Sequence, residues 1–218
     1  MQRIRNQKGF TLIELSIVLV IIGIILGAVL KGQELINNSK AKRIQSDLKG
    51  IEAMIWTYYD RKGRFPGDCN LGGTYTYIPP LLAIGTATPP SNNAVPTADY
   101  CATAATLETI NTSFSDMRVS RLFSTSTPNI ILAKHQQGDY FKIGSTALIA
   151  GVSYNIIVTY GLPAWMAKML DVAIDGAEDG TAGRIRNYSA APASGTAWPL
   201  DTLNDQIVSM SYFFDKNP

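Results

Sequence analysis

The sequence predicts an α+β fold, in which a long N-terminal helix packs against an antiparallel β-sheet formed by the C-terminal part of the chain. Two observations lead to this prediction. The early part of residues 10–62 is almost uninterruptedly apolar, and the later part keeps apolar side chains at helical spacing. Strand-like segments, in contrast, occur only beyond residue 139. At 218 residues, the chain is long enough for one domain with an additional segment.

Residues 10–30 form a continuous apolar segment in which Glu14 is the only charge. As a helix, this segment would be about 32 Å long, which is enough to cross the hydrocarbon core of a bilayer. It is preceded by three basic residues and no acidic ones, Arg3, Arg5 and Lys8. This flank should stay in the cytoplasm, and the rest of the chain should lie outside it. A secretory signal peptide is disfavoured because no small-residue cleavage site follows.

Glu14 is an unusual residue in such a segment. A carboxylate costs about 2.5–3.5 kcal/mol at the centre of a membrane helix and less near its end. A partner for this charge is therefore expected, unless Glu14 lies at the membrane interface, where the cost is small.

The residues around Glu14 resemble a known motif. Lys8–Leu15, KGFTLIEL, is similar to the processing site of type IV prepilins, a family of pilins, minor pilins and the pseudopilins of type II secretion. The resemblance covers the leader and membrane segment closely and the following helix more loosely. It implies cleavage between Gly9 and Phe10, N-methylation of Phe10, and pairing of Glu14 with the N-terminal amine of a neighbouring subunit. The chain departs from many major pilins in having no proline before Pro66.

The helix is predicted to continue beyond the apolar segment. Apolar residues recur at spacings of four, three and four, the stripe of an amphipathic helix, at Ile44, Leu48, Ile51 and Ile55. The helix should run from about Phe10 to Tyr59 and end near Gly63, which can act as a C-cap. The chain is thus divided into a leader (1–9), a membrane or filament-core helix (10–30), an amphipathic continuation (31–64) and a globular head (65–218).

Strand patterns are confined to the second half of the head. Residues 140–149 and 152–160 are predicted to form a hairpin that turns near Ala150–Gly151. A short helix is expected over Pro163–Ile174 and a further strand over Gln206–Phe214. The apolar face of that strand should meet the long helix. It carries Val208, Met210, Tyr212 and Phe214.

The two cysteines, Cys69 and Cys101, are expected to form a disulfide, because the head is predicted to lie outside the cytoplasm. Closing this loop would stabilise the fold by about 3–4 kcal/mol on the chain-entropy model. Two free thiols are the alternative. A redox site is disfavoured because there is no C-x-x-C motif.

The acidic loop 171–180 could suggest calcium, because hard cations prefer several carboxylate oxygens on a turning segment. It lacks the ligand spacing of an EF-hand, however. We therefore predict a solvated turn, with no metal and no cofactor. The segment leads into a predicted short strand at 183–186, an arrangement that resembles prepilin-type heads.

The composition gives little support to an enzyme or a nucleic-acid-binding protein. The single histidine, His135, lies in a polar stretch typical of a turn, so we expect it to be exposed to solvent and not catalytic. Residues 31–64 carry 8 basic and 4 acidic side chains, and residues 65–218 carry 8 and 12. Opposite charges on neighbouring parts suit subunit packing better than phosphate binding. Arg118 and Arg121 are expected on an ordinary surface.

Taken with the resemblance, these features predict a structural subunit of a type IV pilus that polymerises through its N-terminal helix. The expected partners are the prepilin peptidase and N-methyltransferase, an inner-membrane assembly platform, and copies of the chain or other pilins. The precursor would lie in the inner membrane and the filament outside the cytoplasm. A pseudopilin or minor pilin of a secretion or DNA-uptake system is the first alternative, and a monomeric membrane-anchored binding domain is the second.

Overall fold

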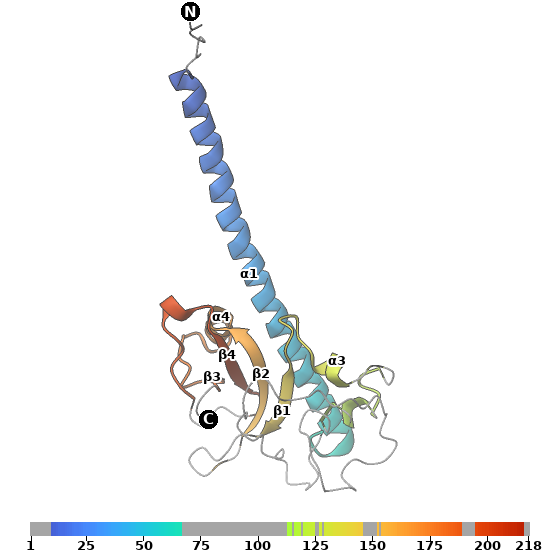
Figure 1. Cartoon of the computed structure of the whole chain (residues 1–218). Coiled ribbons are helices and arrows are strands. Elements are labelled where there is room, and N and C mark those ends of the chain that lie inside the picture. The colour runs from blue at the N-terminus through green and yellow to red at the C-terminus, as the bar shows by residue number, and fades with distance from the viewer. Residues whose placement is uncertain are drawn as a thin grey trace, which may run out of the picture. The chain divides into compact units, whose positions relative to one another are not determined.

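The computed structural model describes residues 10–66, 113–114, 116–118, 120–124, 127, 129–145, 152, 154–188 and 195–215. The chain divides into two compact units, residues 1–40 and 41–218, which are described separately. The elements follow one another in the order α1 (Leu12–Lys62), α3 (Asn129–Ala133), β1 (Phe141–Ser145), β2 (Asn155–Pro163), α4 (Ala164–Asp175), β3 (Ile185–Asn187), the 3-10 helix η2 (Asp201–Leu203) and β4 (Ile207–Phe213) (Figure 1). This arrangement confirms the predicted α+β class.

Helix α1 has 51 residues and passes through both units without interruption. It extends three residues beyond Tyr59 and ends where the sequence predicts a C-cap. Gly63 there has a φ of 69°, and its N–H donates to the carbonyl of Tyr59 at 2.7 Å. Arg61 and Lys62 occupy the last turn, where cations interact favourably with the helix dipole.

The first unit consists of the N-terminal part of α1. This part is long and apolar enough to cross a membrane, judged by length and composition. Its large apolar side chains are all exposed within the described structure. A solvent-exposed apolar surface of this extent indicates a lipid or protein partner.

The second unit is built on a four-stranded antiparallel sheet in the order β1-β2-β4-β3. The predicted hairpin is confirmed by the pairing of β1 with β2, in which Ile143 lies opposite Ile157. Strand β2 runs beyond the predicted end at Tyr160, because an irregularity at Gly161, with a φ of 66°, lets Leu162 pair with Val208. The predicted turn at Ala150–Gly151 lies outside the described residues.

One face of this sheet packs on α4 and on the amphipathic half of α1. The buried residues of α1 include the whole predicted stripe, and they are Ala41, Ile44, Leu48, Ile51, Ile55 and Tyr58. They belong to one cluster with the predicted apolar face of β4, Val208, Met210, Tyr212 and Phe214. The opposite face of the sheet is buried too, around Val158 and Phe213. Both faces of the sheet therefore contribute to the core.

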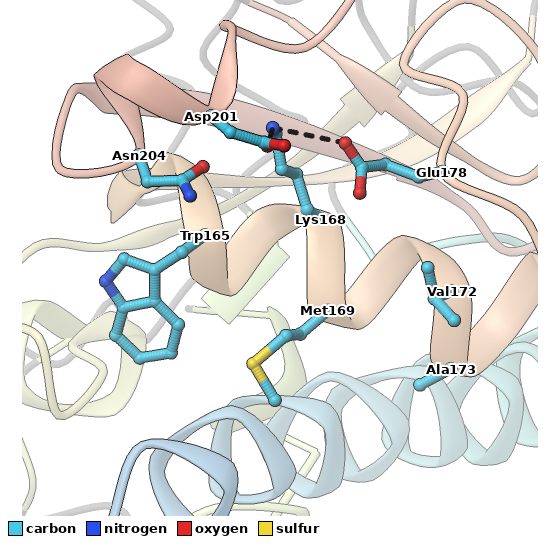
Figure 2. Close-up of a pocket in the computed structure, with 8 residues that line it drawn as sticks. All are labelled: Trp165, Lys168, Met169, Val172, Ala173, Glu178, Asp201 and Asn204. Atoms are coloured by element: carbon cyan, nitrogen blue, oxygen red, sulfur yellow. Dashed lines mark hydrogen bonds and ion pairs between the residues drawn. The ribbon is translucent and has the colours of Figure 1, made fainter. Parts of the chain in front are cut away.

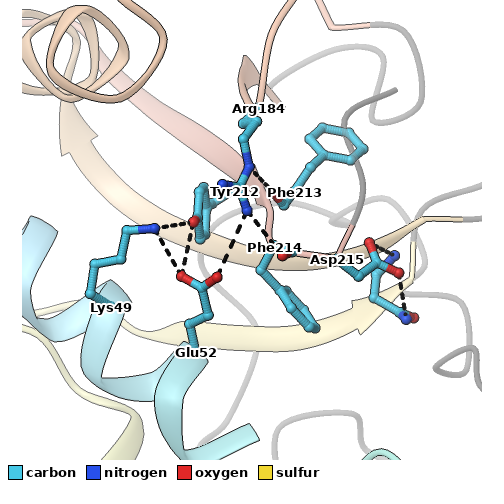
Figure 3. A network of polar contacts seen from close by, with 8 residues as sticks. Lys49, Glu52, Arg184, Tyr212, Phe213, Phe214 and Asp215 are labelled. Atoms are coloured by element: carbon cyan, nitrogen blue, oxygen red, sulfur yellow. Dashed lines mark hydrogen bonds and ion pairs between the residues drawn. The ribbon is translucent and has the colours of Figure 1, made fainter. Parts of the chain in front are cut away.

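A polar network centred on Tyr212 fixes α1 against β4 (Figure 3). The Tyr212 hydroxyl donates to Glu52 Oε2 at 2.9 Å and accepts a hydrogen bond from Lys49. The cations of Lys49 and Arg184 lie 4.8 and 5.0 Å from the centre of the Tyr212 ring. Arg184 also donates to the carbonyls of Phe213 and Phe214, both at 2.9 Å. These contacts fix α1, β4 and Arg184, the residue before β3, in position relative to one another.

Replacing Tyr212 with Phe should lower the free energy of unfolding by about 1–2 kcal/mol, because Glu52 loses a donor and Lys49 loses an acceptor in a partly buried site. Urea unfolding of the detergent-solubilised full chain measures this change. Tyr59→Phe is the matched control, since Tyr59 is exposed and its hydroxyl has no hydrogen bond to any of the described residues. Equal effects of the two substitutions would contradict the role of the network.

Candidate functional site

The start of α1 is closed by a reciprocal pair of hydrogen bonds between Thr11 and Glu14. Glu14 Oε2 accepts hydrogen bonds from the backbone N–H and the hydroxyl of Thr11, both at 2.8 Å. The Glu14 N–H donates to Thr11 Oγ1 at 3.3 Å. This is a capping box, which satisfies backbone donors that a helix otherwise leaves unpaired at its first turn. Glu14 therefore has a structural role within its own chain.

The capping box fixes where the helix begins. Phe10 precedes it in a non-helical conformation and is 88% exposed. Gly9, on the other side of the predicted cleavage position, lies outside the described residues. The structure thus leaves Phe10 accessible and outside the helix.

The groups that donate hydrogen bonds to the Glu14 carboxylate are neutral. Both groups that hydrogen-bond to its carboxylate come from Thr11, and the nearest hydroxyl along the helix, that of Ser16, donates instead to the carbonyl of Ile13 at 2.9 Å. Within the described part of the chain, no cation forms an ion pair with Glu14. Among the residues that the structure describes, the negative charge at the start of the apolar helix therefore has no cationic partner.

The acidic segment 171–180 is only in part the solvated turn that the sequence predicts, because Glu178 and Asp179 are exposed whereas Asp171 belongs to α4 and is buried. Asp171 is 1% exposed, and its Oδ2 accepts hydrogen bonds from Trp198 Nε1 at 2.7 Å and from the Asp179 N–H at 2.8 Å. Its other oxygen, Oδ1, is buried without a hydrogen-bond partner. The prediction of exposure is wrong for Asp171 because the indole of Trp198 covers it from a segment that is distant in sequence.

A second carboxylate of this loop also organises the backbone. Asp175 Oδ2 accepts the N–H of Ile185 at 2.7 Å, at the start of β3. Gly183 lies against the same carboxylate with a φ of 80°, and a Cβ at this position would approach Asp175 Oδ2 to 2.4 Å. Glycine is therefore favoured there, because any other residue would be strained at this φ and would displace the Asp175 carboxylate. Among the described residues, no three His, Cys, Asp or Glu side chains form a group that could hold a metal ion.

Burial raises the pKa of Asp171 to about 6, although the hydrogen bonds from Trp198 and Asp179 oppose this effect. This carboxyl group therefore titrates close to neutral pH. Its pKa is a consequence of its structural position beneath Trp198.

His135 is buried, which contradicts the predicted exposure to solvent. Its Nε2 donates to the carbonyl of Tyr160 at 2.9 Å, and its Nδ1 accepts the N–H of Gln137 at 3.2 Å. Burial lowers the pKa of His135, so the ring stays neutral in the tautomer that these two bonds require. Both ring nitrogens are engaged in holding the turn before β1 against β2.

Arg118 also differs from its prediction. It is buried and donates to the carbonyl of Thr127 at 2.9 Å, whereas Arg121 is exposed. The two residues do not share one surface. Cys69 and Cys101, the predicted disulfide pair, lie outside the described residues.

Comparison with protein families gives one match. Residues 4–30 match the model of the prokaryotic N-terminal methylation motif. This motif is the signature of type IV pilin and pseudopilin precursors. It implies processing by a prepilin peptidase followed by pilin assembly, and it points to a structural protein. No curated protein and no solved structure matches the chain.

The pilin-type motif and the structure agree on the N-terminal segment. The matched residues include Phe10, the capping box and the exposed apolar part of α1. This apolar helix fits a membrane-anchored precursor. The one feature of the pilin-type site that sequence analysis missed is the cap itself, although the spacing Thr11-x-x-Glu14 is its usual signature.

Asp171→Asn should flatten the pH dependence of stability. Because the folded-state pKa of Asp171 lies above its unfolded value, the folded chain binds the extra proton, and stability falls as pH rises from about 4 through 6. Asn keeps an acceptor for Trp198 and Asp179 but carries no charge. Between about pH 5 and 7.5, the wild type should lose about 1 kcal/mol of unfolding free energy relative to the variant.

Urea unfolding at the two pH values measures this difference. Asp205→Asn, a change of the same kind at an exposed residue, serves as the control. If Asp171→Asn follows the wild-type pH dependence, the carboxyl group does not titrate in this range.

Proposed function

We propose that this chain is the structural subunit of a type IV pilus. The observation that carries the proposal is a capped helix with a fully exposed apolar surface, which begins directly after the expected processing site in a matched methylation motif. The precursor would be cleaved between Gly9 and Phe10, methylated on the amine of Phe10, and polymerised through α1. Removing the leader does not disturb the cap, because Thr11 and Glu14 both stay in the mature chain.

Glu14 is the residue that we expect to direct assembly. The capping box satisfies hydrogen bonds of its carboxylate but supplies no positive charge. In lipid or in a filament core, an unpaired charge is costly and attracts an opposite charge strongly. The amine that cleavage creates at Phe10 of a neighbouring subunit is such a charge. Pairing would set the axial position of each subunit relative to the next.

The proposed partners follow from this route. The precursor would be held in the inner membrane by residues 10–30, with the head outside the cytoplasm. An assembly platform would move the processed subunit into an extracellular or periplasmic filament, where contacts with other subunits replace contacts with lipid. A disulfide between Cys69 and Cys101 is proposed for the head, which would lie in an oxidising compartment.

A pseudopilin or minor pilin is the second candidate. One observation favours it, namely that α1 carries no proline, whereas many major pilins have one late in the membrane segment. The two candidates differ in the amount of protein and in the location of the filament. Mass spectrometry of the cell-surface and membrane fractions separates them.

Intact mass spectrometry of filaments sheared from the cell surface tests the proposed function. We expect the chain to dominate this fraction, to begin at a methylated Phe10, and to be two hydrogens lighter than its reduced form because of the Cys69–Cys101 bond. A processed chain that stays in the membrane fraction would support the pseudopilin or minor pilin. An uncut N-terminus in the presence of active peptidase would refute both.

Glu14→Gln separates the charge of this residue from its capping role. Gln also forms a capping box, so the helix start should be preserved while the charge is lost. We expect processed, membrane-inserted subunits whose assembly into filaments is reduced at least tenfold, as judged by the yield of sheared filaments. Glu34→Gln is the control, because Glu34 is an exposed carboxylate of the same helix, paired with Lys31. Normal filaments from Glu14→Gln would show that the charge is not needed.

A further inference from the structure

A groove runs along one side of α4 (Figure 2). Its floor includes Trp165, Met169 and Val172, which are spaced three or four residues apart on the helix, and its volume is about 410 Å³. Val172 is exposed, and Trp165 and Met169 are partly exposed. Side chains at this spacing form the ridge that one helix presents to another.

The rim of the groove is acidic. Lys168 Nζ lies 2.7 Å from Asp201 Oδ1 and 3.1 Å from Glu178 Oε1 (Figure 2). The side chain of Lys168 is 7% exposed, whereas that of Asp201 is 87% exposed. Two carboxylates therefore cover one cation, and the groove presents a net negative charge to its surroundings.

Exposed apolar residues also flank Asn204, a lining residue of the groove, in the sequence. The carbonyl of Asn204 accepts the N–H of Trp165 at 3.0 Å, so the turn after η2 is fixed against the start of α4. Next to Asn204 in the sequence, Leu200, Leu203 and Ile207 are exposed. An acidic rim beside exposed apolar side chains indicates a protein partner that is basic and able to approach closely.

The outward side of α1 in the second unit has these properties. Lys42 is exposed on the side opposite the buried stripe, and it takes part in none of the ion pairs of the described residues. One and two turns further on, Ser46 and Gly50 are exposed and small, so another helix could approach the backbone here. By sequence, residues 31–64 have four more basic than acidic side chains, and the head has four more acidic than basic ones.

We propose that the groove along α4 receives the outward side of α1, around Lys42 and Ser46, of a second copy of this chain. In this contact Lys42 faces the carboxylates of Asp201 and Glu178, and the small residues pack on the apolar floor. The two surfaces are different, so the contact is heterologous, and a heterologous contact whose rotation does not close a ring generates an open, repeating assembly. The proposal rests on the proposed function as a filament subunit. It adds a contact between the head of one subunit and α1 of the next.

Cysteine crosslinking between two tagged copies of the full chain, co-expressed with the peptidase and assembly machinery, tests this contact. One copy carries Ser46→Cys, and the other carries either Ala173→Cys or Asn204→Cys, at the two ends of the groove. Mild oxidation of assembled filaments should give a mixed dimer for one of these two pairs, depending on the direction of the helices. Val152→Cys, at an exposed position outside the groove, is the matched control and should give none.

Charge reversal in the same assay identifies the polar part of the contact. Lys42→Glu in the copy with Ser46→Cys should lower the yield of mixed dimer about tenfold, and Asp201→Lys in the other copy should restore it. Lys62→Glu, the same change at an exposed lysine elsewhere on α1, should have no effect.

Three outcomes overturn the proposal. If filaments of processed subunits form without a mixed dimer, the groove contact is wrong and the proposed function stands. If Ala173→Cys or Asn204→Cys crosslinks to a different protein, the occupant is not a second copy. If the wild-type chain is neither processed nor assembled, the proposed function and the groove contact both fail.

Discussion

The structure depends on one helix that has to satisfy two different environments. A helix pairs its own backbone groups, so it can lie in lipid or in protein without leaving polar groups unpaired. Over its first half, α1 is apolar on every side and exposed, and over its second half a single stripe from Ala41 to Tyr58 is buried. The same element is therefore suited to act as a membrane anchor and supplies one wall of the core.

The parts that could be predicted from sequence are those in which apolar residues repeat locally. The stripe of α1, the C-cap at Gly63, the pairing of β1 with β2 and the inward face of β4 all follow from spacings of two to four residues. Strand β2 exceeds its predicted length because Gly161 accommodates an irregularity, which a pattern of apolar residues does not reveal.

The polar residues were harder to predict because their partners are distant in sequence. His135 hydrogen-bonds to a residue 25 positions away, and Asp171 to a residue 27 positions away. His135 lies in a polar stretch that is typical of a surface turn and Asp171 lies near the end of α4, and each is buried because the fold brings a partner over it. Glu14 is the opposite case, since its partner Thr11 is local and the capping spacing can be seen in the sequence.

The packing energy between two apolar helices changes little as one helix slides along the other. The apolar part of α1 therefore does little to fix the axial position of one subunit relative to the next. Its hydroxyl groups at Thr11 and Ser16 are already engaged within the helix. Glu14 has no cationic partner among the described residues, so a neighbouring amine would give one axial position a clear advantage. However, a single charge pair near the filament axis does not fix how each subunit is rotated about its own helix. A second contact, between the acidic groove of α4 in the head of one subunit and Lys42 on α1 of the next, would remove that freedom.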